Sequence, residues 1–424
     1  MPDYGTTQRD ATRIGRQHDF AEKTQIKVGL TTQLSVITQT QTNIRSLAFS
    51  KQLGFRKVVT ERVTTFLQEH KLPVRDAPAM YLKTAIVIAW WVGTYLLLML
   101  GGFPWYINLV LCASFALAMG AVGFNIMHDA NHGGYSDSPV VNKLLSFMLE
   151  PLGASSFAWR QTHNVWHHTY TNIAGLDDDL ETEGMMRMTP HEEWKPRYRF
   201  QHWYMPFVYG LTLFGFLIRD VRIYFTGRST STKVFPPMKT ADKVTFWAGK
   251  LAFLTIMLVI PLLVHPWHQV LIGVLFVMAL FGLILASIFQ LAHVMPDATF
   301  PEPDSHPMPA DGDPLHIENE WAIHEVETTV NFGPQNKVLN WYAGGLNFQI
   351  EHHLFPKISH VHYAKIAPIV RATCEEFGVR YNSYTSWIDA IIAHWRSLKW
   401  LGQAPTLQLA KVTVLKPQVQ TSRK

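Results

Sequence analysis

The amino-acid sequence predicts an all-α integral membrane protein: four transmembrane helices in two hairpins, with a helical cap on one side that holds a histidine-rich metal site. Three observations lead to this fold class. Hydrophobic residues make up 48% of the 424 residues and charged residues only 16%, whereas charged residues make up about a quarter of a typical soluble domain. The apolar residues are concentrated in four long runs. Many of the 20 histidines gather in short clusters just outside these runs.

The four apolar runs have the length of membrane-spanning helices. Each is about 20 residues long, and at ~1.5 Å rise per residue such a helix crosses the ~30 Å hydrocarbon core of a bilayer. Short tips, GGFP and HPWHQ, separate the two runs of each pair, so that each pair forms a hairpin. Lys250 stands close enough to one end of its run to extend to the membrane surface. The predicted spans are residues 81–100, 105–127, 245–264 and 270–292.

The distribution of basic residues predicts the orientation of these spans. The two hairpin tips contain no Lys or Arg, and nearly all of the 37 basic residues lie before, between or after the hairpins. By the positive-inside rule, both termini and the segment 128–244 are therefore expected in the cytoplasm. An even number of crossings requires the same arrangement.

The segments outside the spans differ in composition. Residues 1–45 are polar and rich in Thr and Gln, which predicts a loosely docked tail, and residues 46–80 are expected to form an amphipathic basic lead-in. Residues 81–375 form the predicted main domain, followed by a cytoplasmic C-terminal segment, 376–424.

Two shorter apolar stretches, 140–157 and 204–218, are predicted to be interfacial helices. If either one spanned the membrane, the histidine clusters would be divided between its two sides. Residues 295–314, rich in Pro and Asp, are expected to form an irregular loop.

Composition also argues against several classes of protein. Cys112 and Cys374 have neither metal-site nor disulfide spacing, which disfavours thiolate zinc sites and iron–sulfur clusters. The net charge of +5 comes from residues that flank the apolar runs and form no stripe with interleaved aromatic residues. Attraction to anionic lipid headgroups therefore explains this charge better than binding to nucleic acid.

Three histidine clusters are the main chemical signal. His128 and His132 follow the second run at i, i+4 spacing, which on a helix places both side chains on one face with Cβ atoms ~5–6 Å apart. The second cluster repeats this spacing, the third is a pair, and one further histidine follows the fourth run directly. These six residues are His163, His167, His168, His352, His353 and His293. The predicted topology puts all eight histidines on one side of the membrane.

Eight imidazoles exceed what one metal ion needs, so two ions are expected. Imidazole suits Fe, Zn, Cu or Ni. The chain lacks both the paired Glu-x-x-His motifs of soluble di-iron bundles and the His-Glu-x-x-His motif of zinc proteases. Bis-histidine haem would need histidines within the spans, which contain none. Isolated histidines are more often surface or satisfied core residues, and His18, His70, His202 and His394 are assigned to that class.

The clusters resemble the three histidine boxes of membrane fatty acid desaturases. The matching motifs are His128-x-x-x-His132, His163-x-x-x-His167-His168 and Gln349-x-x-His352-His353. The glutamine that opens the third box resembles the front-end subgroup, similar to delta-5, delta-6 and linoleoyl-CoA desaturases, which act between an existing double bond and the carboxyl end. The resemblance covers about residues 80–375, so the predicted main domain is a desaturase domain.

This resemblance implies a non-haem di-iron centre as the catalytic group, with O₂ as co-substrate and two electrons from a donor. It implies that the box histidines and His293 bind two iron ions. Gln349, which stands where related enzymes have histidine, could bind metal, bond a metal-bound water or hold a neighbour, and the indirect roles are favoured. His324 is a candidate for the missing imidazole.

Many front-end desaturases carry a fused cytochrome b5 domain with a His-Pro-Gly-Gly motif, which this sequence lacks. A separate donor is therefore expected, either a ferredoxin, a flavodoxin or a free cytochrome b5-type protein, attracted by a basic cytoplasmic face. The expected location is a bacterial inner membrane, and the expected substrate is a fatty acyl-CoA or an acyl-lipid.

Several other residues are candidates for supporting roles. Acceptors that orient the imidazoles are sought among Asp129, Asn164, Glu351 and the triplet 177–179, which could equally be a solvated turn. Tryptophans that line an acyl tunnel or anchor the protein at the interface are Trp159, Trp166, Trp321 and Trp341. Basic residues that hold a phosphate or serve as ordinary inner-side charges are Arg160, Lys195, Arg197 and Arg199.

Two alternatives to a desaturase remain open. A hydroxylase on the same scaffold would use the same centre and differ only in how the acyl chain is placed. A non-catalytic membrane metal carrier is disfavoured, because the spans hold too few ionisable side chains for a transport path.

Overall fold

The computed structural model describes residues 47–49, 52–229, 233–302, 315–317 and 319–405. The chain divides into a small unit, residues 1–48 and 305–315, and a main unit, residues 49–304 and 316–424. The strands β1 (Leu47–Phe49) and β2 (Leu315–Ile317) lie at the boundaries of these units in the sequence. The predicted tail 1–45 and most of the predicted loop 295–314 fall outside the described residues, and everything below concerns the main unit.

Four helices in the described part of the chain are long and apolar enough to cross a membrane, and they coincide with the four predicted runs. The first is α3 (Pro78–Leu100) and the last is α13 (Trp267–His293). The second span consists of α4 (Trp105–Val122), the π-helical turn η2 (Gly123–Met127) and α5 (His128–His132). The third consists of α11 (Thr240–Leu254), the π-helical turn η7 (Thr255–Val259) and α12 (Ile260–Val264).

Proline and glycine set the ends of the hairpins. Pro78 occupies the first position of α3, where its missing N–H costs no helical hydrogen bond. The first hairpin turns at Gly102, which has a φ of 58°, a conformation that glycine adopts at little cost. Pro104 and Pro266 stand at the N-caps of α4 and α13.

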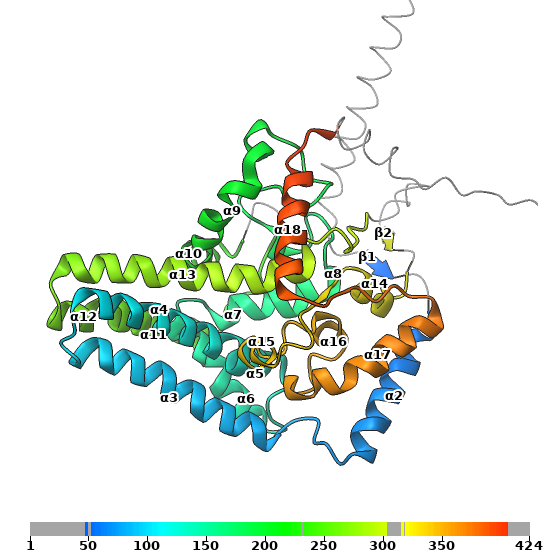
Figure 1. Ribbon diagram of the computed structural model, residues 1–424, viewed down its shortest axis with the longest axis horizontal. Helices are drawn as coiled ribbons and strands as arrows, with labels where there is room; N and C mark the ends of the chain where they lie inside the picture. The colour runs from blue at the N-terminus through cyan, green and yellow to red at the C-terminus, as the bar shows by residue number, and fades with distance from the viewer. Residues whose placement is uncertain (1–46, 50–51, 230–232, 303–314, 318, 406–424) are drawn as a thin grey trace, which may run out of the picture. The chain divides into compact units, whose positions relative to one another are not determined.

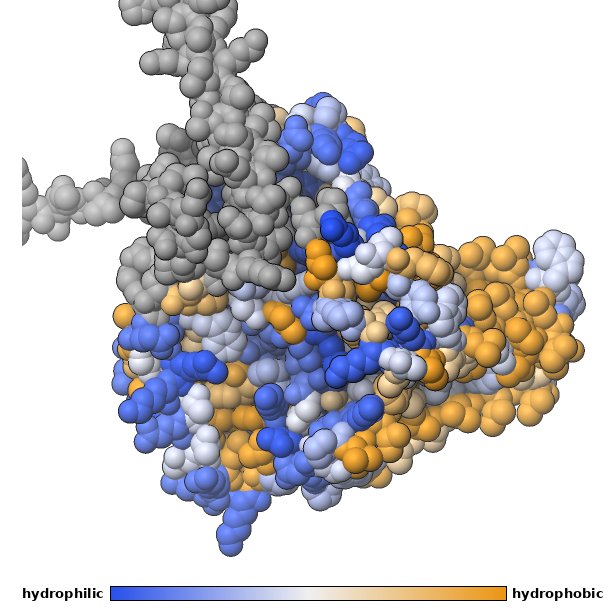
Figure 2. Space-filling view, turned by 180° about the vertical axis from the view of Figure 1, so that it is seen from behind, coloured by the Kyte–Doolittle hydropathy of each residue, from blue (hydrophilic) through white to orange (hydrophobic). Residues whose placement is uncertain are grey.

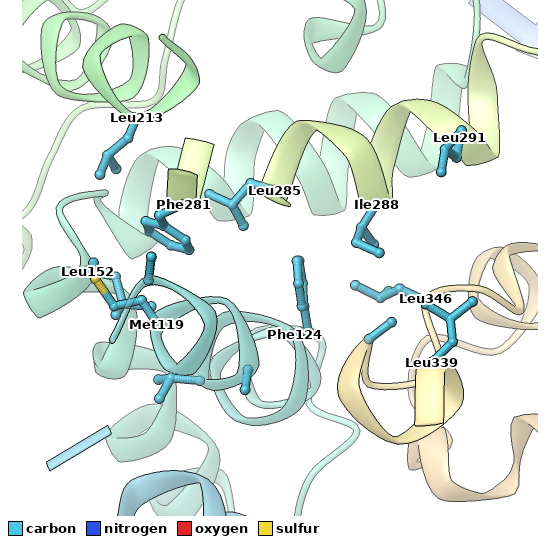
Figure 3. Packing of buried hydrophobic residues seen from close by; sticks show 14 of the residues in the cluster. Met119, Phe124, Leu152, Leu213, Phe281, Leu285, Ile288, Leu291, Leu339 and Leu346 are labelled. Carbon is cyan, nitrogen blue, oxygen red and sulfur yellow. The ribbon is translucent and has the colours of Figure 1, made fainter. Parts of the chain in front are cut away.

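The spans pack around α4 and α13. Phe281, Leu285 and Ile288 of α13 face Met119 of α4 and Phe124 of η2 in one buried cluster (Figure 3). Alanine substitution at a buried leucine or phenylalanine of this kind costs about 2–5 kcal/mol, because the cavity left behind closes only in part. This core fixes the two helices whose ends carry His128, His132 and His293.

The outer faces of the spans expose apolar side chains. Leu100, Trp105, Leu263 and Ile272 are each more than 60% exposed. Figure 2 shows that apolar residues cover the end of the main unit formed by the spans, whereas polar residues cover much of the other end. A surface of this kind is compatible with lipid and not with water. The predicted fold class, a helical integral membrane protein with four spans, is confirmed.

The cap lies at one end of the spans (Figure 1). It is built from short helical segments that connect the hairpins or follow the last span. Between the hairpins these are α6 (Pro139–Ser146), η3 (Phe147–Leu152), α7 (Ser156–Trp159), η4 (Arg160–His167), α8 (His168–Tyr170), η5 (Asp178–Leu180), η6 (Pro196–Phe200), α9 (Gln201–Gly210) and α10 (Thr212–Thr226). After α13 they are α14 (Trp321–Glu327), α15 (Lys337–Tyr342), α16 (Gln349–Leu354), η8 (His360–His362), α17 (Tyr363–Phe377) and α18 (Trp387–Leu401). The strands β3 (Asn331–Phe332) and β4 (Ser383–Tyr384) form a parallel pair with Asn331 opposite Ser383.

The predicted amphipathic lead-in contains α2 (Phe55–Glu69). Its residues Phe55, Val59, Val63 and Leu67 recur every four positions and are buried against α17. Glu320 accepts hydrogen bonds from the backbone N–H groups of Leu53 and Arg56, so a carboxylate satisfies orphan donors at the helix start.

The two stretches predicted to be interfacial correspond to α6–α7 and α9–α10. Neither is among the four spans of the described chain. Phe207 of α9 and Phe225 of α10 are about 70% exposed, which agrees with helices that lie in a membrane surface.

Candidate metal centre

The eight predicted histidines come together where the cap meets the ends of α4 and α13. The second span continues through η2 into α5 and delivers His128 and His132, whose ring centroids lie 4.8 Å apart. His293 is the last residue of α13. The other five are supplied by η4 (His163, His167), α8 (His168) and α16 (His352, His353). Each of the eight is at most 8% exposed.

Seven of the eight imidazoles fall into two neighbouring groups, and His168 lies between them. One candidate ligand atom from each of His128, His132, His163 and His352 lies within 4.8 Å of the others, and the same holds for His167, His293 and His353. His168 forms a similar set with His352 and His353 and so links the two groups. Two neighbouring sites with three or more nitrogen donors each can hold two metal ions.

The structure itself tests whether a metal fits. None of the eight Nε2 atoms has a hydrogen-bond partner in the part of the chain that the structure describes. Buried polar atoms without partners are costly, and a metal ion would satisfy them. Burial and neighbouring imidazoles hold four pKa values well below the ordinary histidine value, those of His163, His168, His352 and His353. These rings are therefore neutral, as metal ligands must be.

The acidic triplet orients two of the rings. Nδ1 of His167 lies 3.0 Å from Asp177 Oδ1, and Nδ1 of His163 lies 3.0 Å from Asp179 Oδ2. Because the Nδ1–H groups donate to these carboxylates, the Nε2 lone pairs are free for a metal. Burial opposes protonation of His167, but the two carboxylates outweigh it and raise its pKa to about 9, so a metal ion at Nε2 would displace a proton from this ring. Asp178 turns the other way and bonds Lys233 at 2.9 Å.

Asn172 joins the triplet to the end of α13. Its backbone N–H donates to Asp177 Oδ2, and its side-chain amide donates to the carbonyls of His293 and Thr328. Its φ of 61° lies in the left-handed region, which asparagine tolerates better than most residues. The backbone and side chain of this one residue therefore connect Asp177, which bonds His167 of the second box, to the end of α13 at His293.

Glu325 and Asp129 hold the histidines of two other elements. Nδ1 of His353 lies 2.6 Å from Glu325 Oε2, which also accepts a hydrogen bond from the Thr171 hydroxyl. Asp129 lies 3.9 Å from His128 Nδ1 and 2.9 Å from Nδ1 of His360.

The contacts of Asp129 continue through His360 to α3, because Nε2 of His360 lies 2.8 Å from Lys83 Nζ. The Tyr363 hydroxyl approaches Nδ1 of His352 at 3.4 Å.

The other predicted supporting residues have different contacts. Asn164 donates to the Asn131 carbonyl, and Glu351 accepts from Asn331 and Tyr381, so in the described chain neither bonds an imidazole. Gln349 is buried in the first turn of α16, and its Oε1 has no partner among the described residues. His324 is also buried, but it joins none of the histidine groups found in the described chain.

Of the predicted tryptophans, Trp159 is the one whose ring packs on the clustered imidazoles. Its ring stacks on His163 at 4.3 Å and is 5.5 Å from His128. Trp166 packs on Phe235, the Trp321 indole donates to the His168 carbonyl, and Trp341 lies beside Lys83.

Among the predicted basic residues, Arg160 reaches Asn131 Oδ1 at 3.4 Å. The other three are on the surface: Lys195, Arg197 and Arg199.

Of the isolated histidines, His18 lies outside the described residues, and the other three join none of the histidine groups. His70 is exposed, and His394 is buried with both nitrogens bonded, to Tyr209 and to the Val294 carbonyl. His202 is buried beside Trp395.

Similarity to known proteins extends over most of the chain. The sequence profile described as fatty acid desaturase matches residues 104–385. An sn-1 linoleoyl-lipid 6-desaturase of Arthrospira platensis is 40% identical over 370 residues, which cover 87% of this chain and 98% of the relative.

A Synechocystis protein of the same description is 36% identical, over 84% of this chain and 98% of the relative. An acyl-lipid (8-3)-desaturase of Physcomitrium patens is 35% identical over 82% of this chain and 72% of the relative.

Proposed function

Because the chain belongs to the fatty acid desaturase family, we propose that it introduces a double bond at position 6 of a linoleoyl chain carried by a membrane glycerolipid. The family makes it an oxidoreductase acting on fatty acyl chains, and its relatives are front-end desaturases. The position and the lipid-linked substrate are supported by two relatives of the same description, each matched over 98% of its length. An acyl-CoA substrate is the alternative.

The cofactor of this proposal is a pair of iron ions held by the eight histidines. The observation that carries it is the convergence of eight buried Nε2 atoms that have no hydrogen-bond partner among the described residues, seven of them in two groups and that of His168 between the groups. Bound iron would supply the redox chemistry that removes hydrogen from an unactivated carbon chain with O₂, which zinc does not provide. A donor set rich in imidazole and free of thiolate suits iron.

The reaction balances with one external electron pair. A –CH₂–CH₂– unit, O₂, two electrons and two protons give –CH=CH– and two water molecules. The two carbons lose two hydrogen atoms, which carry two electrons and two protons. With the two electrons from the donor, O₂ gains four electrons in all. The task of the protein's own side chains is to hold the acyl carbons at the metal centre and to keep the histidine rings in place.

Several side chains perform that second task. Asp177, Asp179 and Glu325 each fix a ring by accepting a hydrogen bond at Nδ1. Trp159 covers one face of His163 and presents an apolar wall on which an acyl chain can lie. The spans deliver His128, His132 and His293 from within the membrane, so the substrate can remain in lipid while it reacts.

The proposed orientation places the cap in the cytoplasm of a bacterial cell, at the inner membrane. The hairpin tips lack Lys and Arg, whereas Lys195, Arg197 and Arg199 lie exposed on the cap. A separate donor, either a ferredoxin, a flavodoxin or a free cytochrome b5-type protein, would dock on this basic side.

Expression in a host fed with linoleate, followed by double-bond mapping of its lipids, tests the proposal. The expected product is an 18-carbon chain with a new double bond at position 6, found in glycerolipids before it appears in acyl-CoA. A hydroxy acid would indicate an acyl hydroxylase instead. Absence of any product from a metal-loaded, inserted protein with a working donor would favour a metal carrier. His70→Ala, at the exposed histidine that follows α2 as its C-cap, is the control and should retain the product.

A further inference from the structure

A pocket opens between the tips of the two hairpins, at the opposite end of the spans from the histidines. Its cavity volume is about 100 Å³, which is smaller than the ~300–1,000 Å³ of a typical small-molecule site, so it has room only for a narrow segment of a ligand. All four spans contribute to its wall, which includes Met99 of α3, Cys112 and Phe115 of α4, Met257 of η7 and Val274 of α13.

The chemistry of the wall favours an uncharged amphiphile. Among the described residues, no Asp, Glu, Lys or Arg lines the pocket, and the polar side chains of Asn108, His265 and Gln269 lie near the hairpin tips. His265 Nε2 lies 2.8 Å from the Leu98 carbonyl, and the Asn108 amide donates to the Phe103 carbonyl. Asn108 Oδ1 is buried and has no partner among the described residues, so it can accept a hydrogen bond from a ligand hydroxyl.

Two features of the sequence keep the pocket open. Gly273 has no side chain, and a Cβ placed there would meet Cys112 Sγ only at 3.6 Å, so a side chain would extend into the free space. The π-helical turn η7 supplies Ile256 and Met257 to the wall, and the Tyr95 hydroxyl donates to the Ile256 carbonyl at 2.9 Å. Voids larger than a water molecule are rare and destabilising in packed cores, so a pocket kept here favours an occupant.

The pocket is separate from the metal centre. Phe115, which lines the pocket, stands 13 positions before His128 in the sequence. This separation corresponds to about 20 Å along a helix. Met119, Phe124, Phe281 and Leu285 pack together in the space between (Figure 3).

We propose that this pocket binds one acyl chain of a neutral, hydroxyl-bearing glycerolipid, which enters from the leaflet opposite the metal centre. The chain would lie on Phe115 and Val274, and a headgroup hydroxyl would donate to Asn108. Such a ligand joins the tips of α4 and α13, the two spans that carry histidines at their other ends.

Photo-crosslinking of the purified full chain tests the proposal. The probe is dioleoylglycerol with a diazirine at the end of one chain, and its charged counterpart is dioleoylphosphatidylglycerol with the same diazirine. The neutral probe should label the peptides around Cys112–Phe115 and Val274–Val277 at least fivefold more than the anionic one. Equal labelling by both probes, or labelling confined to the outer faces of the spans, would overturn the proposal.

Two variants that fill the pocket sharpen the test. Gly273→Phe should reduce labelling at least fivefold, whereas Ile272→Phe, at a neighbouring side chain that is 64% exposed, should leave it unchanged. Cys112→Phe fills the same space from α4 and should give the same loss if Gly273→Phe fails to insert.

The chain-length preference of the Gly273→Phe variant distinguishes a bound lipid from the substrate as the occupant of the pocket. If Gly273→Phe shifted the preferred substrate to shorter acyl chains, the pocket would hold the substrate tail and the proposal would be wrong. Crosslinking needs no turnover, so its result does not depend on the proposed reaction.

Discussion

The spans and the cap bury opposite kinds of side chain. Between α4 and α13 the core is apolar, and the outer faces of the same helices expose Leu, Ile and Trp. Where the cap meets the span ends, the buried residues are histidines, aspartates and glutamates joined by hydrogen bonds from several elements. One hydrophobic core supports a second, polar core built at its end.

This difference divides the tasks of the molecule. Apolar packing is tolerant of small changes in shape, whereas a buried polar network is costly unless each group finds its partner. Substitutions in the apolar core of the spans should therefore change stability and leave the chemistry intact. Substitutions in the cap should change metal binding and activity first.

The largest effect is expected from removing one histidine of the second group. His167→Ala should lower product formation below detection, at least 10³-fold, because a proposed metal ligand and its hydrogen bond to Asp177 are both lost. The protein should still insert, because the spans are unchanged. Lipid analysis of cells with matched amounts of membrane-inserted protein measures this, and an active variant would remove His167 from the ligand set.

Removing a carboxylate that orients a ring should have a smaller effect. Asp177→Asn should reduce activity or metal affinity by about 10–100-fold, the usual range for partners of metal-bound histidines. Asp137→Asn, at a carboxylate that is 75% exposed, is the matched control and should behave as wild type. Equal activity of the two variants would show that the triplet is only a structural turn.

A substitution in the apolar core of the spans tests whether this region contributes to stability and not to metal binding. Phe281→Ala should destabilise the protein by about 3–5 kcal/mol while iron per folded chain stays the same. Leu275→Ala, on the lipid-facing side of α13, should change stability little. Thermal unfolding in detergent with parallel iron analysis checks both. Loss of iron from the folded Phe281→Ala variant would contradict the proposal that the span core affects stability but not metal binding.

The smallest effect concerns Glu150, a buried carboxyl group in η3. Burial raises its pKa to about 7, although the Ser156 hydroxyl donates to it. The folded chain thus keeps a proton that the unfolded chain releases near pH 4.5, so stability falls as pH rises from about 4.5 to 7.

At about 1.4 kcal/mol per pKa unit, this loss is about 3 kcal/mol. Glu150→Gln should remove it, which makes the variant more stable than wild type at pH 8 but not at pH 4. Melting curves at the two pH values measure the difference, and parallel curves for the two proteins would refute the assignment.

Sequence reasoning succeeded where the signal is local. Four apolar runs predicted the four spans, and i, i+4 spacing after the second run predicted that His128 and His132 share a face, as they do in α5. The resemblance to front-end desaturases is confirmed by the comparisons. The topology predicted that eight distant histidines would meet, and the structure brings all eight together, while their role as iron ligands remains a prediction.

Contacts between residues that are far apart in the sequence could not be predicted in this way. Glu325, Asn172 and His360 carry no spacing pattern, and each becomes informative only once the fold brings it to a box histidine or its neighbour. Lys83 lies in the first predicted run, where the surrounding apolar residues hide it in any average of hydropathy, yet it bonds His360. The π-helical form of η4, which carries His163 and His167, likewise has no signature in the sequence.

Iron analysis of the purified full chain after anaerobic loading is the most direct test of the central claim, that a membrane-anchored set of histidines holds a pair of iron ions. Two irons per chain are predicted, with X-ray absorption showing nitrogen-dominated coordination and no sulfur. A chain that held a single iron, or zinc alone, under the same conditions would contradict the claim.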